Sequence, residues 1–182
     1  NFQASQQFGD DFSLSVDGST YLKQRFYKRY EENPRDVDYY YYGGSATMTA
    51  SPFRNVDTNV EIVASRYETR NIDASLSSDN RVEYIYRVMP GLAIKPYSWL
   101  SLTQDYEVKI EYTEFSFDEN RNYIDRTTVL ATSANITPVK SLVLGFKHRY
   151  DMRDTGSYYR VGGEDRYNRS SEDFKHELSL DV

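Results

Sequence analysis

The chain has 182 residues, of which 38% are hydrophobic, and it carries 18 Tyr and 9 Phe. Its mean hydropathy of -0.76 is low for a chain with a large core, yet so many aromatic residues are atypical of a disordered chain. The net charge of -6 disfavours a nucleic-acid or anionic-lipid binder, and the absence of cysteine excludes disulfides and thiolate chemistry.

No apolar run approaches the roughly 20 residues that a membrane helix needs, so the sequence excludes a helical membrane protein. The opening residues, NFQASQQFGDDF, lack the basic segment and apolar core of a signal peptide. A mature form or a fragment of a longer protein is compatible with this beginning.

Alternation of apolar and polar residues predicts β-strands along the chain, because side chains point to opposite faces of a strand with a period of two. The first strand is expected at 12–16, with a tight turn after it at Asp17-Gly18. A second strand is expected at 21–30, where basic and apolar residues interleave. In an acidic protein we interpret those basic residues as one face of a strand rather than as a nucleic-acid stripe. The segment EENPRDVD is expected to form a loop.

The next two strands are expected at 39–51 and 56–65, joined by a turn at the sequence SPFRN. The polar segment NIDASLSSDN is expected to form a loop. A strand at 82–94 then carries the most complete apolar file in the sequence. Pro90 lies within it and predicts a bulge or local break, because proline lacks the backbone donor of a ladder.

The longest regular stretch is WLSLTQDYEVKIEYTEF, residues 99–115, which separates an apolar file from a polar file almost completely. At roughly 3.3 Å per residue it spans about 50 Å, far more than the usual strand of about five or six residues. Strands at 130–136, 142–150 and 174–182 follow. A long loop, DTGSYYRVGGEDRYNRS, is expected before the last of them.

Two regularities connect these elements. The sequences TASP, AIKP and NITP end at Pro52, Pro96 and Pro138, 44 and 42 residues apart, which predicts a hairpin repeat of about forty residues. Short turns are predicted near residues 17, 53, 97 and 139, and long polar loops near residues 34, 75, 120 and 162. We therefore expect short turns at one end of the sheet and long loops at the other.

This arrangement resembles the porin-like transmembrane β-barrels of the outer membrane of Gram-negative (diderm) bacteria. Such barrels have short periplasmic turns, longer extracellular loops, an apolar outer band and aromatic girdles. The resemblance implies an all-β, antiparallel up-and-down transmembrane β-barrel, with residues 1–182 forming a single barrel domain or barrel segment. It also implies that aromatic residues near the strand ends form girdles: Tyr40, Tyr42, Tyr84, Tyr86, Tyr97, Trp99, Tyr112 and Tyr150.

About nine strands are expected, whereas bacterial single-chain barrels have even strand numbers. The sequence also stops at LSLDV, without the terminal aromatic residue common in this class. Both features favour an incomplete barrel whose remaining strands lie outside this sequence. The alternative fold is a soluble antiparallel sandwich with one solvent-exposed face, although sandwich strands are usually shorter than the strands expected here.

The resemblance assigns the two files of side chains to two environments. The polar file is expected to line the lumen: Asp57, Glu61, Asp105, Glu107, Lys109, Glu111, Lys147, Arg149, Asp173, Lys175 and Glu177. The apolar file is expected to face membrane lipid: Val60, Ile62, Val88, Leu92, Ile94, Leu100, Leu102, Val108, Ile110, Leu142, Leu144 and Phe146. A charged, hydrated lumen suits small hydrophilic solutes, or a protein partner in the lumen or at the periplasmic face.

No catalytic, cofactor or metal site is expected, and we predict that the protein is not an enzyme. Its two histidines, His148 and His176, fall in the apolar file, where an outward-facing role is favoured over catalysis. The loop that begins at Asp118 resembles a calcium loop only at its start, because Tyr123 and Val129 occupy its glycine and acidic positions.

Three functions are compatible with these residues. The first is a channel for the transport of small hydrophilic solutes across the outer membrane. The second is a structural sheath or anchor barrel that encloses or holds a partner protein, as in porin-cytochrome conduits. The third is a soluble β-rich binding or adhesion module, which would stay in solution without detergent.

Overall fold

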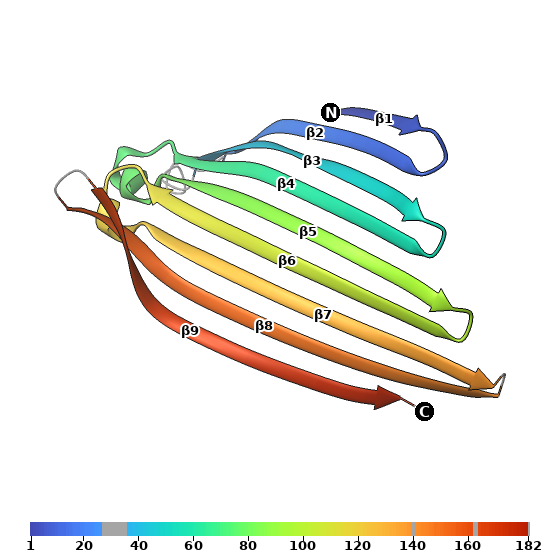
Figure 1. Cartoon of the computed structure of the whole chain (residues 1–182). Helices are drawn as coiled ribbons and strands as arrows, with labels where there is room; N and C mark the ends of the chain where they lie inside the picture. The colour runs from blue at the N-terminus through green and yellow to red at the C-terminus, as the bar shows by residue number, and fades with distance from the viewer. Residues whose placement is uncertain (27–35, 140, 162–163, 182) are drawn as a thin grey trace.

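The computed structural model describes residues 1–26, 36–139, 141–161 and 164–181, and it is all-β. Nine strands form one antiparallel sheet in sequence order, shown as a single layer in Figure 1. The strands are β1 (Phe2–Phe8), β2 (Phe12–Arg25), β3 (Val37–Phe53), β4 (Val56–Asn71), β5 (Arg81–Tyr97), β6 (Leu100–Phe115), β7 (Tyr123–Val139), β8 (Leu142–Val161) and β9 (Glu164–Asp181). Two short 3₁₀ helices, η2 (Ala74–Asp79) and η3 (Glu119–Arg121), lie in connections.

The sheet is open. Within the described residues β1 and β9 are its two edges, and the strand order does not join them. The predicted all-β, antiparallel up-and-down arrangement is confirmed, whereas this chain does not close into a barrel by itself. None of the helices in the described part of the chain has the length and apolar character needed to span a membrane.

The N-terminal hairpin differs from the prediction. The chain reverses at 9–11, where Gly9 has a φ of +68°, and β2 runs straight through the predicted turn at Asp17-Gly18. Gly18 is buried opposite Phe2, whose ring occupies the space that a side chain would fill. A neighbouring aromatic ring can stabilise a glycine within a strand in this way. The strands predicted at 12–16 and 21–30 are therefore one strand as far as Arg25. The loop predicted at 31–38 lies outside the described residues as far as residue 35, and its last two residues, Val37 and Asp38, belong to β3.

The total of nine strands agrees with the prediction only because this fusion is offset by β1, which was not predicted. The loop predicted from Asp154 to Ser170 is also wrong, because β8 continues to Val161 and β9 begins at Glu164. Tyr158 faces Tyr167 across these strands, with ring centroids 5.4 Å apart. Cross-strand aromatic pairs stabilise a sheet, and here they order a segment whose composition is typical of a loop.

The three proline-containing hairpin ends share one irregularity, which gives the predicted repeat a structural counterpart. The register between the paired strands shifts between Ala50 and Phe53, between Ile94 and Tyr97, and between Ile136 and Val139. Cross-strand partners share a face, and Phe53, Tyr97 and Val139 are paired with Val56, Leu100 and Leu142. The bulges therefore turn the residue after each proline onto the apolar face.

Pro90 produces no bulge. The pairing of β5 with β6 is interrupted beside it, but the register is unchanged, with Val88 opposite Val108 and Gly91 opposite Asp105. The missing proline donor thus leaves a local gap in the ladder without shifting the strand.

Successive hairpins are staggered by a constant step. One row across the sheet contains Phe12, Thr58, Gln104 and His148. The strands that contain these residues begin at Phe12, Val56, Leu100 and Leu142. Each hairpin therefore extends two residues beyond the one before it, along the side of the sheet that is on the right in Figure 1. Equivalent backbone hydrogen bonds join neighbouring hairpins at this edge: Ser51 N to Asp11 O at 2.8 Å, Lys95 N to Asn55 O at 2.9 Å, and Thr137 N to Trp99 O at 2.7 Å.

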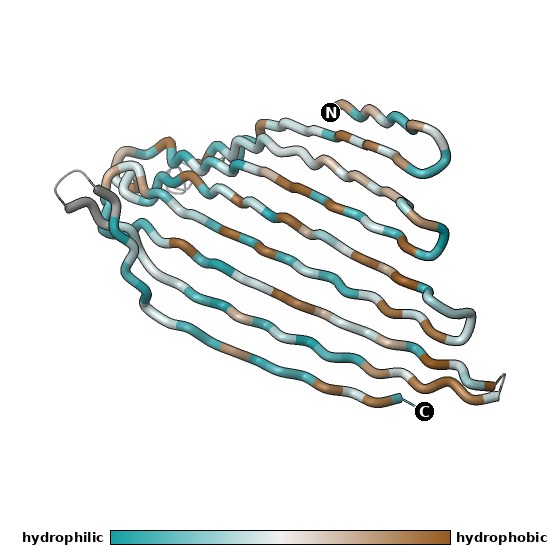
Figure 2. The backbone as a smooth tube through the Cα atoms, in the orientation of Figure 1, coloured by the Kyte–Doolittle hydropathy of each residue, from teal (hydrophilic) through white to brown (hydrophobic). Residues whose placement is uncertain are grey.

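The sheet has almost no buried apolar core. Ile124, at 6% exposure, is the one buried hydrophobic residue among those described, whereas Ile62 and Leu178 expose 50% and 71% of their surface. Figure 2 shows hydrophobic and hydrophilic residues alternating along the strands of this single layer. One face of the sheet is consequently apolar and uncovered.

Candidate functional site

The register gathers the predicted lumen-lining residues on one face of the sheet, which we call the charged face. Residues directly opposite each other on neighbouring strands share a face, and the chain of partners runs from β4 to β9. On this face lie Asp57, Glu61, Asp105, Glu107, Lys109, Glu111, Lys147, Arg149, Asp173, Lys175 and Glu177. The structure therefore brings together all the residues that alternation had placed in the polar file.

Ion pairs run along the charged face. Arg87 Nη1 of β5 lies 3.9 Å from Glu107 Oε1 of β6, and Lys109 Nζ lies 2.9 Å from Glu111 Oε1 on β6. The side chains in these two pairs are about one-third exposed, and exposed pairs contribute about 0–1 kcal/mol each. Further pairs on this face are Arg149–Asp151, Lys147–Asp181 and Lys175–Glu177. Opposite charges are thus interleaved on a hydrated surface.

Two hollows on the charged face differ in their charge. A smaller one of about 350 Å³ is lined by Asp57, Asn59 and Asp105. A larger one of about 780 Å³ is lined by two basic residues, Lys147 and Arg149, and by two acidic residues, Asp105 and Glu177. The smaller hollow is therefore acidic, whereas the larger one combines charges of both signs.

A tyrosine ladder on the charged face was not identified from the sequence. Tyr21, Tyr41 and Tyr67 are cross-strand partners, with ring centroids 5.0 Å apart for the first two and 4.7 Å apart for the last two. Gly43 leaves space for the hydroxyl end of the Tyr41 side chain. The run YYYY at 39–42 indicates such a ladder, because successive residues of a strand fall on opposite faces and the run therefore places tyrosines on both.

The predicted lipid-facing residues occupy the opposite face, which we call the apolar band. Its members are successive cross-strand partners or lie two residues apart on one strand. They are Val60, Ile62, Val88, Leu92, Ile94, Leu100, Leu102, Val108, Ile110, Leu142, Leu144 and Phe146. The two histidines, His148 and His176, lie on this face too.

Aromatic residues border the apolar band at both ends. At the hairpin end, Tyr97 stacks on Trp99 with ring centroids 5.2 Å apart and an interplanar angle of 1°. Tyr42 and Tyr86 lie eleven residues before Phe53 and Tyr97 on β3 and β5. The remaining predicted girdle residues lie on the same face. Tyr40, Tyr84 and Tyr112 lie at this second border, whereas Tyr150 is eight residues from the start of β8, inside the apolar band.

A charged cluster lies just beyond this second border. Asp154 of β8 is 1% exposed, and its carboxylate accepts hydrogen bonds from Arg126 Nε at 2.8 Å and Nη2 at 2.5 Å. Arg169 Nε of β9 lies 3.5 Å from the same carboxylate, and the Tyr167 ring lies beneath the Arg126 guanidinium at 4.3 Å. Figure 1 shows β8 and β9 bending at this end. The cluster was missed because Asp154, Tyr167 and Arg169 belong to the segment predicted as a loop.

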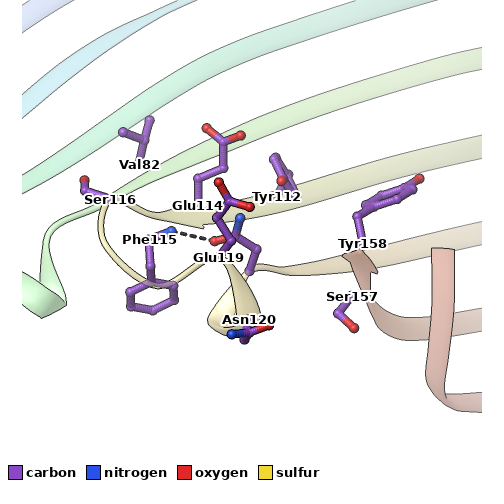
Figure 3. Close-up of a pocket in the computed structure, with 10 residues that line it drawn as sticks. Val82, Tyr112, Glu114, Phe115, Ser116, Glu119, Asn120, Ser157 and Tyr158 are labelled. Carbon is purple, nitrogen blue, oxygen red and sulfur yellow. Dashed lines mark hydrogen bonds between the residues drawn. The ribbon is translucent and has the colours of Figure 1, made fainter. Parts of the chain in front are cut away.

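A hollow of about 830 Å³ (Figure 3) adjoins this cluster through Tyr158, whose ring centroid lies 5.4 Å from that of Tyr167. Tyr112 and Tyr158 line it, and the carboxylates of Glu114 and Glu119 point to the same side in Figure 3. Two residues that line the hollow are joined by a hydrogen bond: the backbone N of Phe115 donates to the side-chain oxygen of Asn122 at 2.7 Å. The hollow is therefore a polar recess at the border of the apolar band.

The two 3₁₀ helices in the long connections are capped by aspartate side chains, Asp73 for η2 and Asp118 for η3. The Asp73 carboxylate accepts hydrogen bonds from the Ser75 hydroxyl at 2.5 Å and the Ser75 backbone N at 2.7 Å, and these bonds hold the pKa of Asp73 below its usual value. Asp118 likewise accepts from the backbone N of Asn120 at 3.2 Å. In the described ranges, no group of three or more His, Cys, Asp or Glu residues is arranged to hold a metal ion.

No protein-family model, curated protein or solved structure matches the chain. The charged face and the apolar band are therefore the basis for assigning a function.

Proposed function

We propose that the chain forms part of the wall of a bacterial outer-membrane β-barrel and that the assembled barrel is a porin-like channel for small hydrophilic solutes. In this arrangement the charged face lines a hydrated lumen and the apolar band contacts lipid. Further strands of the same protein close the gap between β1 and β9.

The constant stagger of the hairpins is the observation that carries this proposal. A two-residue step advances about 6.6 Å along the strands for every two strands, which together span about 9.6 Å of the sheet. If all the hairpin ends lie in one plane, the strands tilt by about 35° from its normal, which agrees with the roughly 35–45° of transmembrane barrels. A sheet in a sandwich does not close on itself, so its geometry does not require a constant step between hairpins.

The aromatic borders of the apolar band support the same proposal. Eleven residues separate Tyr42 from Phe53 and Tyr86 from Tyr97. At about 3.3 Å per residue and a tilt of about 35°, this spacing gives about 30 Å, close to the apolar band of about 25 Å between the girdles of such barrels.

The uncovered apolar face disfavours the soluble alternative. A soluble sheet buries its apolar face against a second layer, but the described part of this chain is one layer in which Ile62, Val88 and Phe146 expose 50%, 41% and 44% of their surface. Lipid would cover this face without a second protein layer. The interleaved charges on the other face suit water and polar solutes rather than hydrocarbon.

Planar-bilayer recordings of the purified full-length protein test the channel. We expect stepwise ion conductance, together with a change in gel migration between unheated and boiled samples, because a closed barrel resists denaturation by detergent. A protein with heat-dependent migration that conducts no ions would contradict the channel. Identical migration before and after boiling would contradict the barrel itself.

A sheath or anchor barrel is the second candidate, favoured by the length of the strands. Strands β3–β9 contain 16–20 residues, whereas about 9–11 residues cross a membrane. The wall would therefore extend beyond the lipid on the side of the Arg126–Asp154 pair, deep enough to enclose part of another protein. A partner that co-purifies in fixed stoichiometry would support this function, and a solitary conducting barrel would contradict it.

A further inference from the structure

A row of polar side chains crosses the apolar band. Gln104, Thr132 and His148 are successive cross-strand partners on β6, β7 and β8. His176 of β9 adjoins them, with its ring centroid 5.9 Å from that of His148 and 4.7 Å from that of Tyr150. We call Gln104, Thr132, His148 and His176 the polar patch. Within the described part of the chain, its side chains make no hydrogen bond.

The polar patch lies inside the apolar band rather than at its border. Gln104 is four residues from the start of β6, and His148 is six residues from the start of β8, in a band about eleven residues deep. Gln104 and His176 are exposed, and Thr132 and His148 are half-buried. A polar group that faces hydrocarbon without a hydrogen-bond partner is costly, about 1–3 kcal/mol by protein mutational measures. Lipid is therefore a poor neighbour for this patch.

We propose that two copies of the protein meet in the membrane through the polar patch, an inference that rests on the proposed membrane barrel. The amide of Gln104 and the imidazoles of the histidines each contain a donor and an acceptor. A surface of this kind is complementary to itself, as a twofold interface requires. The patch contains no acidic or basic group of fixed charge that would call for an opposite charge on a different partner. Exposed apolar residues around it, Leu102, Tyr106 and Leu178, supply the packing surface.

Cysteine cross-linking tests this interface, because the natural chain contains no cysteine. Single cysteines are placed at positions 104, 132, 148 and 176 of the full-length protein in liposomes, and a mild oxidant is added. We expect a disulfide-linked dimer from at least one of them, since a twofold axis brings equivalent residues together. The matched control is Thr58→Cys, which lies on the same row but four strands away from His148 on β4. It should remain monomeric.

A second experiment removes the hydrogen-bonding groups of Gln104 and His176. In Gln104→Leu/His176→Leu we expect the dimer dissociation constant in detergent to rise by about tenfold or more, with heat-dependent migration retained. Thr58→Val should leave the dissociation constant unchanged. A protein that inserts into liposomes but stays monomeric, with no cross-link at any patch position, would overturn this inference alone. A protein that does not insert would overturn the proposed function as well.

Discussion

Glu61 and Ile62 are neighbours in the sequence, yet their side chains lie on opposite faces of β4. Glu61 is opposite Thr47 and Met89 on the charged face, whereas Ile62 is opposite Ala46 and Val88 in the apolar band. None of these cross-strand partners is charged, so the same substitution at the two positions isolates the effect of the face.

We expect Ile62→Lys to impair membrane assembly and Glu61→Lys to be tolerated. A lysine on the lipid face near the middle of the membrane costs about 2–4 kcal/mol, whereas a change on the lumen face alters passage more than stability. The measurement is the fraction of protein that folds into lipid vesicles, followed by gel migration without heating. Equal folding of the two variants would contradict the assignment of the faces. Ile110 is less suitable for this comparison, because its cross-strand partner Arg126 is charged.

At the scale of single elements, the close approach of β2 and β3 depends on Gly44. A Cβ at this position would lie 2.6 Å from the backbone oxygen of Asp17, whereas a Cβ at Gly145 of β8 would have nothing closer than 3.4 Å. Backbone atoms cannot move aside as the end of a flexible side chain can. The two glycines therefore form a matched pair within strands of the same sheet.

We expect Gly44→Ala to lower the free energy of unfolding by about 1–3 kcal/mol, because the added methyl group forces β2 and β3 apart. Gly145→Ala should leave it unchanged or raise it by up to about 1 kcal/mol, because alanine restricts the unfolded chain. Urea titration of the lipid-reconstituted protein measures both. A loss of stability in Gly145→Ala as large as in Gly44→Ala would contradict the geometry.

Near the bent ends of β8 and β9, Arg126 pairs with the buried carboxylate of Asp154. Replacing Asp154 by Asn removes the charge that Arg126 and Arg169 share. We expect a local destabilisation of about 1–3 kcal/mol, the usual cost of leaving a buried polar group without its partner, and faster protease cleavage near residue 160. As a control, Asp181→Asn breaks the exposed pair with Lys147 and should not change the cleavage rate. Equal rates in both variants would show that the Arg126–Asp154 pair does not hold the bend.

At the scale of the whole molecule, one uncovered apolar face is combined with two strand edges, β1 and β9, that are unpaired within the described residues. Exposed strand edges and exposed apolar surface both promote association in water. We expect residues 1–182, expressed alone, to aggregate in buffer and to give a β-rich circular dichroism spectrum in detergent. A monodisperse monomer in detergent-free buffer would instead support a soluble module and contradict the membrane assignment.

Short-range alternation was enough to predict most strands and the division into two faces, because a strand places every second side chain on one side regardless of its neighbours. The proline repeat likewise predicted equivalent hairpins. Alternation failed where a partner strand changes the local preference. Gly18 sits in a strand because the Phe2 ring covers it, and Tyr158 is in a strand because Tyr167 faces it.

The sequence by itself determined the composition of the charged face and the apolar band. Only the tertiary structure decided that the hairpins step by two residues, that the bulges turn Phe53, Tyr97 and Val139 onto the apolar face, and that Arg126 meets Asp154. Each of these features depends on register, which is a relation between strands far apart in the chain. A periodic pattern within one strand carries no information about how far that strand is shifted against the next.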